Sequence, residues 1–381
     1  MNDVKEWLPG ALCSKQLEYL FDQEVIKGER PSEFGESSFD LTISDSKAYM
    51  LPKGGVKPAG DGYGVLTTKL KDFFVTLKPD ENGEFLLKKG TTYLFGIGQR
   101  LHVDNIREHR FFGQATAKSS IGRMDVLVRL IVDGMDCYEG FIPDRISSGD
   151  MYVEISPLSF DVVVKRGIAI TQLRLFYGSP DECEITGDEL HRATLIGSRT
   201  DGYLRVDLSN IKVKDYSACA FKAAPQEGVI PVRLWSQKPK IEPHKYWECI
   251  ASKKVNGTPY LPIEKERFYI LRSKERLALH DSLAVYCLAI DESIGEMRIH
   301  YAGFVHPLFG REREDDQKGT PLIFEVRGHD VPVVLHDGEK LAKLKYYRMS
   351  DRFERSVSEI KGRVDGYKDQ TLKLSAFFGD W

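Results

Sequence analysis

The sequence predicts a mainly β protein made of two tandem jelly-roll or β-barrel units with a few short helices. Short runs rich in β-branched and aromatic residues alternate with turn residues along most of the chain, as is typical of sandwiches and barrels. The length of 381 residues suffices for two domains of ordinary size. A set of residues from the first half also recurs in the second half at a nearly constant offset.

Two segments have helical patterns. Leu17, Leu20 and Phe21 lie on one face of a helix that we expect Ser14 to cap. Further along, Thr186-Gly187-Asp188-Glu189 has the form of a capping box and predicts a second short helix. The strand signal dominates elsewhere. The clearest predicted strands are residues 92–95, 111–116, 126–132, 152–155 and 160–164.

The repeat is defined by matching residues in the same order. Three pairs share an offset of 171 residues, namely Glu154 and Glu325, Gly167 and Gly338, and Gln172 and Lys343. Upstream, residues 120–124 are echoed by residues 293–297 at an offset of 173, and a change in loop length would produce this small drift. We therefore expect an internal duplication, with a first unit over residues 1–198 and a second, degenerate unit over residues 199–381 that ends in a C-terminal tail.

The two copies differ in their polar residues. Arg123 falls opposite Glu296, Ser119 opposite Glu292, and Asp136 opposite His306. Because the scaffold positions survive while the polar residues change, we expect one working site per chain, in the first unit.

Charge and composition exclude several classes of protein. The 54 Lys and Arg residues nearly balance the 57 Asp and Glu residues, leaving a net charge of −3, so a nucleic-acid or membrane surface is not expected. No apolar run approaches the roughly 18–20 residues of a membrane helix. The segment Met1-Asn2-Asp3-Val4-Lys5-Glu6-Trp7 has no signal-peptide character, so a cytoplasmic location is expected.

The cysteine pattern argues against a zinc enzyme. Six cysteines are scattered along the chain with no CxxC pair, and the His-x-Glu and Pro-Cys-x-x-Cys signature of zinc deaminases is missing. A Walker-type phosphate loop is missing as well. We therefore expect no zinc site and no P-loop.

One stretch combines the side chains of a site. Ala117-Lys118-Ser119-Ser120-Ile121-Gly122-Arg123 places two hydroxyls, a glycine and two cations between two predicted strands. Glu154 follows within a later strand, and a charge between apolar neighbours is costly unless it is paired or used. The alternatives are a polar turn for the first segment and a solvent-facing position for Glu154.

These motifs resemble the dCTP deaminase branch of the trimeric dUTPase superfamily, in its long two-repeat form. Ser119-Ser120-Ile121-Gly122-Arg123 is similar to the Ser-Ser-x-x-Arg segment, and Met135-Asp136 to an Ile-Asp pair. Gly167-Ile168-Ala169-Ile170-Thr171-Gln172-Leu173 is similar to the Gly-x-x-Ile-x-Gln-Leu strand, and Ser37-Ser38-Phe39-Asp40-Leu41 to Ser-Tyr-Asp-Leu. Glu154 falls at the catalytic glutamate of the deaminases. The resemblance spans residues 10–177 and implies two dUTPase-like, distorted jelly-roll units.

The resemblance implies a role for each matched residue. Glu154, Ser119 and Arg123 would be catalytic. The substrate-binding set would be Lys118, Ser120, Val132, Asp136, Tyr138 and Gln172, with Tyr367 and Gln370 from a tail that closes over the triphosphate. Departures from the family pattern surround Asp136, because Val132-Asp133-Gly134 replaces Thr-x-His-Arg, Tyr138 lies one residue early, and residues 142–150 form an inserted loop.

The expected reaction is the zinc-independent hydrolytic deamination of dCTP to dUTP, which supplies thymidylate synthesis. Glu154 would act as the base, with a pKa raised by burial and lowered again by a nearby Arg123. Mg²⁺ would arrive with the triphosphate, dTTP or dUTP is the candidate effector, and a homotrimer is the expected assembly. Two alternatives stay open. One is dUTP diphosphatase activity, alone or coupled to deamination, with Asp136 as base, and the other is a nucleotide-binding regulator without turnover.

Overall fold

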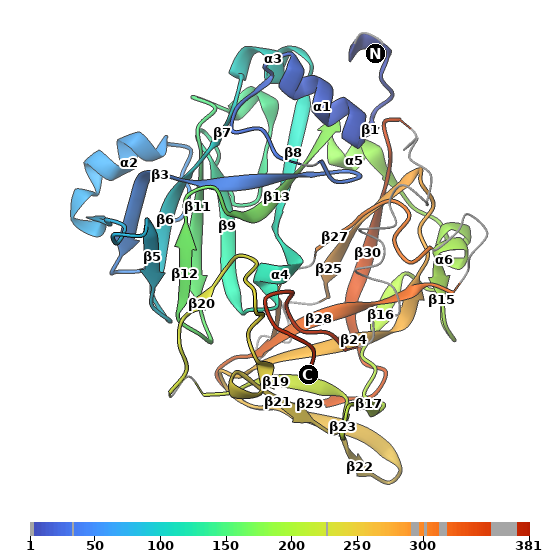
Figure 1. Cartoon of the computed structure of the whole chain (residues 1–381). Helices are drawn as coiled ribbons and strands as arrows, with labels where there is room; N and C mark the ends of the chain where they lie inside the picture. Colours follow the sequence, from blue (N-terminus) through green and yellow to red (C-terminus); the bar gives the residue numbers. More distant parts are fainter. Residues whose placement is uncertain are drawn as a thin grey trace. The chain divides into compact units, whose positions relative to one another are not determined.

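The structure of the chain is a computed structural model that describes residues 4–32, 34–225, 228–290, 297–300, 303–311, 318–351 and 372–381 (Figure 1). The chain divides into two compact units. The first unit falls within residues 1–184, 230–235 and 347–353. The second falls within residues 185–229, 236–346 and 354–381.

The first unit is built mainly from strands. Its strands are β1 (Gly10–Ala11), β2 (Ile26–Gly28), β3 (Phe39–Leu51), β4 (Val75–Thr76), β5 (Glu84–Leu87), β6 (Thr92–Ile97), β7 (Gln99–Leu101), β8 (Phe111–Ala117), β9 (Val126–Val132), β10 (Gly140–Phe141), β11 (Met151–Pro157), β12 (Val162–Lys165), β13 (Ala169–Tyr177) and β20 (Val232–Arg233). Its helical segments are η1 (Val4–Glu6), α1 (Ser14–Asp22), α2 (Tyr63–Lys69), η2 (Lys71–Phe73), α3 (Val103–Glu108), α4 (Ser119–Gly122), η3 (Pro143–Arg145) and α5 (Pro180–Cys183).

A nine-stranded sheet forms a nearly closed barrel in this unit. Its main strand order is β10-β8-β13-β3-β6-β11-β9, with β1 added to β13 and β4 to β3. Alternate residues of β3, such as Phe39, Leu41 and Ile43, point into the core, as expected for strands with one buried face. The apolar face of α1 packs on this core through Leu17 and Leu20.

A smaller apolar cluster lies on the opposite face of β6, β9 and β11. It contains Leu51, Tyr63, Leu66, Leu94, Ile131 and Tyr152. The segment between β3 and β4, residues 52–74, supplies Tyr63 and Leu66 from α2 and is called the cap segment here (Figure 1). Because only part of each strand's outer face is apolar, this cluster is much smaller than the barrel core.

The second unit is also mainly β. Its elements are α6 (Asp188–Thr194), β15 (Leu195–Ile196), β16 (Tyr203–Arg205), β17 (Ile211–Val213), β18 (Tyr216–Ala218), β19 (Ala220–Ala223), η4 (Pro243–Lys245), β21 (Trp247–Ile250), β22 (Lys253–Val255), β23 (Thr258–Ile263), β24 (Phe268–Leu277), β25 (Leu283–Ala289), β26 (Met297–His300), β27 (Phe304–Val305), β28 (Thr320–Gly328), β29 (Val333–His336) and β30 (Lys340–Arg348), and β14 (Glu184–Ile185) lies at the division between the units. One of its sheets has the order β21-β19-β24-β28-β26, and another the order β14-β30-β25-β27. The mainly β fold class with a few short helices is confirmed.

The two units share local details as well as strand content. In the first unit a turn glycine, Gly167, has φ 79°, and its N–H donates to the Ile43 carbonyl. In the second, Gly338 has φ 86°, and its N–H donates to the Val206 carbonyl. Both glycines occupy the left-handed region that disfavours other residues, at the positions paired by the offset of 171.

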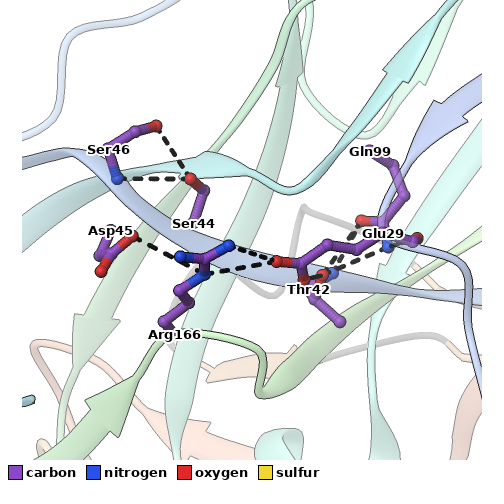
Figure 2. A network of polar contacts seen from close by, with 7 residues as sticks. All are labelled: Glu29, Thr42, Ser44, Asp45, Ser46, Gln99 and Arg166. Atoms are coloured by element: carbon purple, nitrogen blue, oxygen red, sulfur yellow. Dashed lines mark hydrogen bonds and ion pairs between the residues drawn. The ribbon is translucent and has the colours of Figure 1, made fainter.

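A buried polar side chain organises the same place in each unit. Gln99 accepts the Thr42 backbone N–H through Oε1 at 3.0 Å and donates to the Glu29 carbonyl at 2.6 Å, and Arg166 pairs with the Glu29 carboxylate (Figure 2). In the second unit, Glu275 accepts the Arg205 backbone N–H at 2.6 Å. Each side chain thereby satisfies a strand N–H that would otherwise be buried without a partner.

The two predicted helices are present, but their caps differ from expectation. Cys13 is the N-cap of α1, and Ser14 is its first helical residue. Gly187 is the N-cap of α6, with no side-chain hydrogen bond, so the expected capping box at Thr186 does not form. Among the residues that the structure describes, none of the helices has the length and apolar character needed to cross a bilayer.

Candidate active site

Glu154 lies in the middle of β11 on the face covered by the cap segment. It is paired with Leu94 of β6 on one side and with Arg129 of β9 on the other. Its neighbours Val153 and Ile155 point into the core, so the alternation of the strand turns Glu154 to the opposite face. The side chain is only 4% exposed, and the solvent-facing alternative for this residue is therefore excluded.

The cap segment contacts the Glu154 carboxylate directly. The Val56 backbone N–H donates to Oε1 at 2.9 Å. A Cβ at Gly55 would lie 2.9 Å from Oε1 and 3.0 Å from Oε2, which is closer than side-chain contacts allow. The backbone therefore approaches the carboxylate so closely that a larger residue at position 55 would have to displace it.

Two tyrosines, Tyr63 of the cap segment and Tyr138, and an arginine complete the surroundings of this carboxylate. Tyr138, in the loop after β9, donates a hydrogen bond to Glu154. The Arg129 guanidinium lies over the Tyr138 ring, 4.9 Å from its centre, where cation–π attraction holds the two together. The site thus draws on β9, β11, the loop after β9 and the cap segment.

The surroundings shift the pKa values of these groups. Burial raises the pKa of the Glu154 carboxyl, while the Tyr138 hydroxyl, the Val56 N–H and the Arg129 charge oppose part of that rise. Burial and the Glu154 charge raise the pKa of Tyr138 to about 12, so this hydroxyl stays protonated and can donate. A buried carboxyl with a raised pKa binds a proton more readily than an exposed one, as a general base must.

A cavity of about 160 Å³ adjoins the carboxylate. Its lining consists of Gly55, Thr92, Leu127, Arg129, Glu154 and Ser156. Thr92 and Ser156 face each other across β6 and β11, with their hydroxyl oxygens 2.8 Å apart. The cavity therefore offers a carboxylate, a guanidinium and two hydroxyls to a ligand.

Lys118 and Gln172 meet at a second place, around Asp40 of β3. The Lys118 ammonium pairs with Asp40 Oδ2, and Gln172 Nε2 donates to Asp40 Oδ1 at 3.2 Å. Strand pairing explains the meeting, because Gln172 is opposite Asp40 on one side and Thr116 of β8 on the other. Three motifs far apart in the sequence are brought together here.

The Ser-Ser-x-x-Arg segment forms the short helix α4 and its C-cap, Arg123. Ser119 is exposed, Ser120 is half-buried and Arg123 is buried. This segment leads into β9, where Val126 is paired with Pro157, while Glu154 is paired with Arg129 three residues further along. The arginine that lowers the pKa of Glu154 is Arg129 rather than the expected Arg123.

Two other predicted substrate-binding residues have partners other than the Glu154 carboxylate. The Val132 side chain is buried in the barrel core. Asp136 is exposed and pairs with Arg145 of the inserted loop at 2.7 Å, and this hydrogen bond lowers the pKa of Asp136. Tyr367 and Gln370 lie outside the described residues.

Comparison with known proteins identifies the family. The N-terminal domain model of 2'-deoxycytidine 5'-triphosphate deaminase matches residues 8–179, and the C-terminal domain model of the same enzyme matches residues 187–378. The chain belongs to the 2'-deoxycytidine 5'-triphosphate deaminase family. The expected resemblance to a two-domain dCTP deaminase is thereby confirmed.

A solved structure supports the same conclusion. The crystal structure of 2'-deoxycytidine 5'-triphosphate deaminase from Agrobacterium tumefaciens is similar with a TM-score of 0.77 and 25% sequence identity. The similarity covers 91% of this chain and 97% of that chain. No curated protein sequence matches the chain.

Sequence reasoning missed several residues around the carboxylate of this dCTP deaminase family member. Gly55, Val56 and Tyr63 belong to the cap segment, which has no motif, and their contacts with β11 are visible only in the structure. Arg129 had a detectable signal, because a lone cation inside an apolar strand run indicates a paired or functional charge. Asp40 stood in a recognised motif, yet nothing in the sequence indicated its partners.

The described residues contain no group of three or more His, Cys, Asp or Glu side chains arranged to hold a metal ion. All six cysteines are free, and four of them are buried.

Proposed function

We propose that the chain deaminates dCTP to dUTP and ammonia with Glu154 as the general base, and that it thereby supplies dUTP for thymidylate synthesis. The observation that carries the proposal is the buried Glu154 carboxylate, held by donors beside a cavity of about 160 Å³. Cavities of roughly 150 Å³ accept a benzene-sized ring, so the space is suited to a pyrimidine.

The residues present support a sequence of proton transfers. Glu154 takes a proton from a water as its oxygen adds to C4 of cytosine, and delivers that proton to N3. The carboxylate then takes the proton of the new hydroxyl and passes it to the amine. The C4–N bond breaks, ammonia leaves and the C4 carbonyl of uracil forms, so that dCTP and water give dUTP and ammonia.

Hydrogen-bond donors and cations define the other roles. Arg129 and Tyr138 hold the ionised Glu154 before each proton transfer, and Tyr138 also offers its ring to the substrate. Lys118, Ser120 and Gln172 bind the triphosphate, with Mg²⁺ bound to the nucleotide and Lys118 exchanging Asp40 for a phosphate oxygen. dTTP or dUTP then acts as an effector by competing for the same residues.

Ser119 and Arg123 are assigned to the site across a subunit boundary. Ser119 is exposed on α4, and the described contacts of Glu154 come from Val56, Tyr63, Tyr138 and Arg129 instead. A homotrimer that places α4 of one copy beside Glu154 of the next would complete the site, with Ser119 orienting the water. Arg123 would support α4 from its buried position.

Mixing two inactive variants tests this arrangement. Glu154→Gln and Ser119→Ala chains, unfolded together and refolded, should regain ammonia release because some interfaces combine an intact Glu154 with an intact Ser119. A mixture as inactive as its components, although assembled, would place Ser119 within its own chain's site or outside any site.

We infer that the second unit is a duplicate that lost the site. Gly338 repeats the turn of Gly167, and Glu275 repeats the hydrogen bond of Gln99 to a strand N–H. Tyr93 and Tyr269 each accept a backbone N–H from five residues earlier, at 2.8 Å and 3.2 Å. The counterparts of Ser119 and Arg123 lie outside the described residues, and both are glutamates in the sequence.

The diphosphatase alternative rests on Asp136 as base. Its pairing with Arg145 lowers its pKa, which weakens it as a proton acceptor. Incubation of the purified chain with dCTP and Mg²⁺, followed for ammonia, dUTP and pyrophosphate, separates the candidates. Ammonia with accumulating dUTP supports the proposal, and added pyrophosphate indicates a bifunctional enzyme. Binding without any product would favour the regulator and contradict the proposal.

A further inference from the structure

The cap segment is anchored by a buried acid that the reaction does not use. Asp133, at the end of β9, is 5% exposed. Its Oδ1 accepts the Tyr63 backbone N–H at 2.8 Å, and its Oδ2 accepts the Ser148 hydroxyl at 2.8 Å. Asp133 thus joins the start of α2 to the inserted loop that follows Asp136.

Tyr63 connects the Asp133 anchor to the residues around Glu154. Its ring stacks on Tyr152 of β11, with ring centres 5.2 Å apart and planes inclined by 29°. Its hydroxyl donates to the Val56 carbonyl at 2.6 Å. The backbone N–H of the same residue, Val56, donates to Glu154 Oε1.

The cap segment also approaches the Asp133 carboxylate closely, at a second glycine. A Cβ at Gly62 would lie 3.1 Å from Asp133 Oδ2, and a Cβ at Gly55 would lie 2.9 Å from Glu154 Oε1. The two glycines let the cap segment approach both carboxylates closely. The segment is therefore held at two acids, 21 residues apart in the sequence. Asp133 directly follows β9, and Glu154 lies on the neighbouring strand β11.

We propose that Asp133 and Tyr63 are positioning residues for Glu154, acting through the Val56 N–H and, for Tyr63, also through its own hydroxyl beside the carboxylate. Asp133 fixes the backbone of Tyr63, the Tyr63 hydroxyl fixes Val56, and Val56 holds the carboxylate in the orientation that faces the cavity. The inference rests on the proposed role of Glu154 and adds the chain of contacts that keeps this base in place.

The chain of contacts has a consequence for pH dependence. The groups facing Glu154 are the Val56 N–H and Tyr63 from the cap segment, Tyr138 from the loop after β9, and Arg129 from β9. Each of them favours the ionised carboxylate. Loosening Val56 and Tyr63 removes two of the four, so the pKa of Glu154 should rise further above its ordinary value.

The test compares Tyr63→Phe with Tyr49→Phe. Tyr63→Phe deletes the hydroxyl and keeps the ring on Tyr152, while Tyr49→Phe deletes a hydroxyl in the same small cluster, where Tyr49 packs on Phe74. With Tyr63→Phe we expect kcat for ammonia release to fall roughly three- to tenfold at neutral pH, with KM for dCTP within about twofold. The acidic limb of the kcat–pH profile should move up by roughly half to one pH unit. Tyr49→Phe should match the wild type.

Asp133→Asn adds an independent measurement, because the amide keeps one acceptor and replaces the other by a donor. In both Asp133→Asn and Asp133→Ala, the acidic limb of the kcat–pH profile should move to higher pH. The shift should be smaller for Asp133→Asn than for Asp133→Ala. Unchanged profiles in folded Tyr63→Phe and Asp133→Ala proteins would overturn the inference, while leaving the role of Glu154 intact. Normal ammonia release by Glu154→Gln would instead overturn the proposed base itself, so the two failures are distinguishable.

Discussion

The backbone N–H of Val56 donates a hydrogen bond to Glu154 Oε1 over 2.9 Å, although 98 residues separate the two in the sequence. The contact joins an irregular segment to the centre of a β-strand. It holds one oxygen of a buried carboxylate and brings Gly55 against the same group. The geometry of the base therefore depends on backbone that carries no functional side chain at the point of contact.

Gly55→Ala should impair catalysis through its methyl group alone. A Cβ would lie 2.9 Å from Glu154 Oε1, so either the cap segment or the carboxylate must move. We expect kcat for ammonia release to fall roughly ten- to a hundredfold. Gly64→Ala in α2 is the matched control, because its Cβ meets nothing within 4 Å and the helix should gain about 0.5–1 kcal/mol. Equal kcat for both variants would contradict the close approach.

Arg129→Ala should move the acidic limb of the kcat–pH profile to higher pH. The positive charge of Arg129 lowers the pKa of Glu154, so its removal leaves the carboxyl protonated over a wider range. Arg129→Lys keeps the charge but loses the planar contact over Tyr138, and should lie between the wild type and Arg129→Ala. If the acidic limb lies at the wild-type pH in both variants, Arg129 does not lower the pKa of Glu154.

Glu154→Gln should stabilise the folded chain more at neutral than at acidic pH. Burial raises the folded-state pKa above the ordinary value of 4.5, so the ionised carboxyl destabilises the folded state above the raised pKa. Below the ordinary value both states are protonated and this penalty is gone. Thermal unfolding of wild type and variant at about pH 7 and near pH 4.5 measures the difference. A variant less stable than the wild type by the same amount at both pH values would contradict the raised pKa.

Lys118→Ala should weaken binding of the triphosphate and leave the chemistry largely intact. We expect KM for dCTP to rise about five- to tenfold, with kcat within about twofold, since a charged contact to phosphate is lost. Lys69→Ala removes an exposed lysine that pairs with Asp61 in the cap segment, and should leave KM unchanged. A loss confined to kcat would place Lys118 near the reacting atoms instead.

The strands of the first unit were predictable because their apolar periodicity is local. Residues 126–132 were expected as a strand and form β9 with the same bounds. The face of Glu154 was not predictable, since alternation alone leaves open which face an added segment covers. Only the structure shows that residues 52–74 lie over it, because their contacts with β11 depend on tertiary packing rather than on a local pattern.

The sequence also did not predict which distant segments pack together. Residues 230–235 and 347–351 pack with the first unit, yet their composition does not distinguish them from the flanking second unit. The pairing of Lys118 with Asp40 likewise depends on β3, β8 and β13 being neighbours in the sheet. Motif spacing selected the candidate residues, and strand order decided which of them meet.

Ammonia release from dCTP by folded Glu154→Gln tests the central claim most directly. The variant keeps the shape of the side chain and an acceptor for the Val56 N–H, but it cannot take a proton from water. We predict that it binds dCTP with near wild-type affinity and releases no ammonia above the uncatalysed rate. Deamination at a wild-type rate by this variant would contradict the assignment of Glu154 as the base.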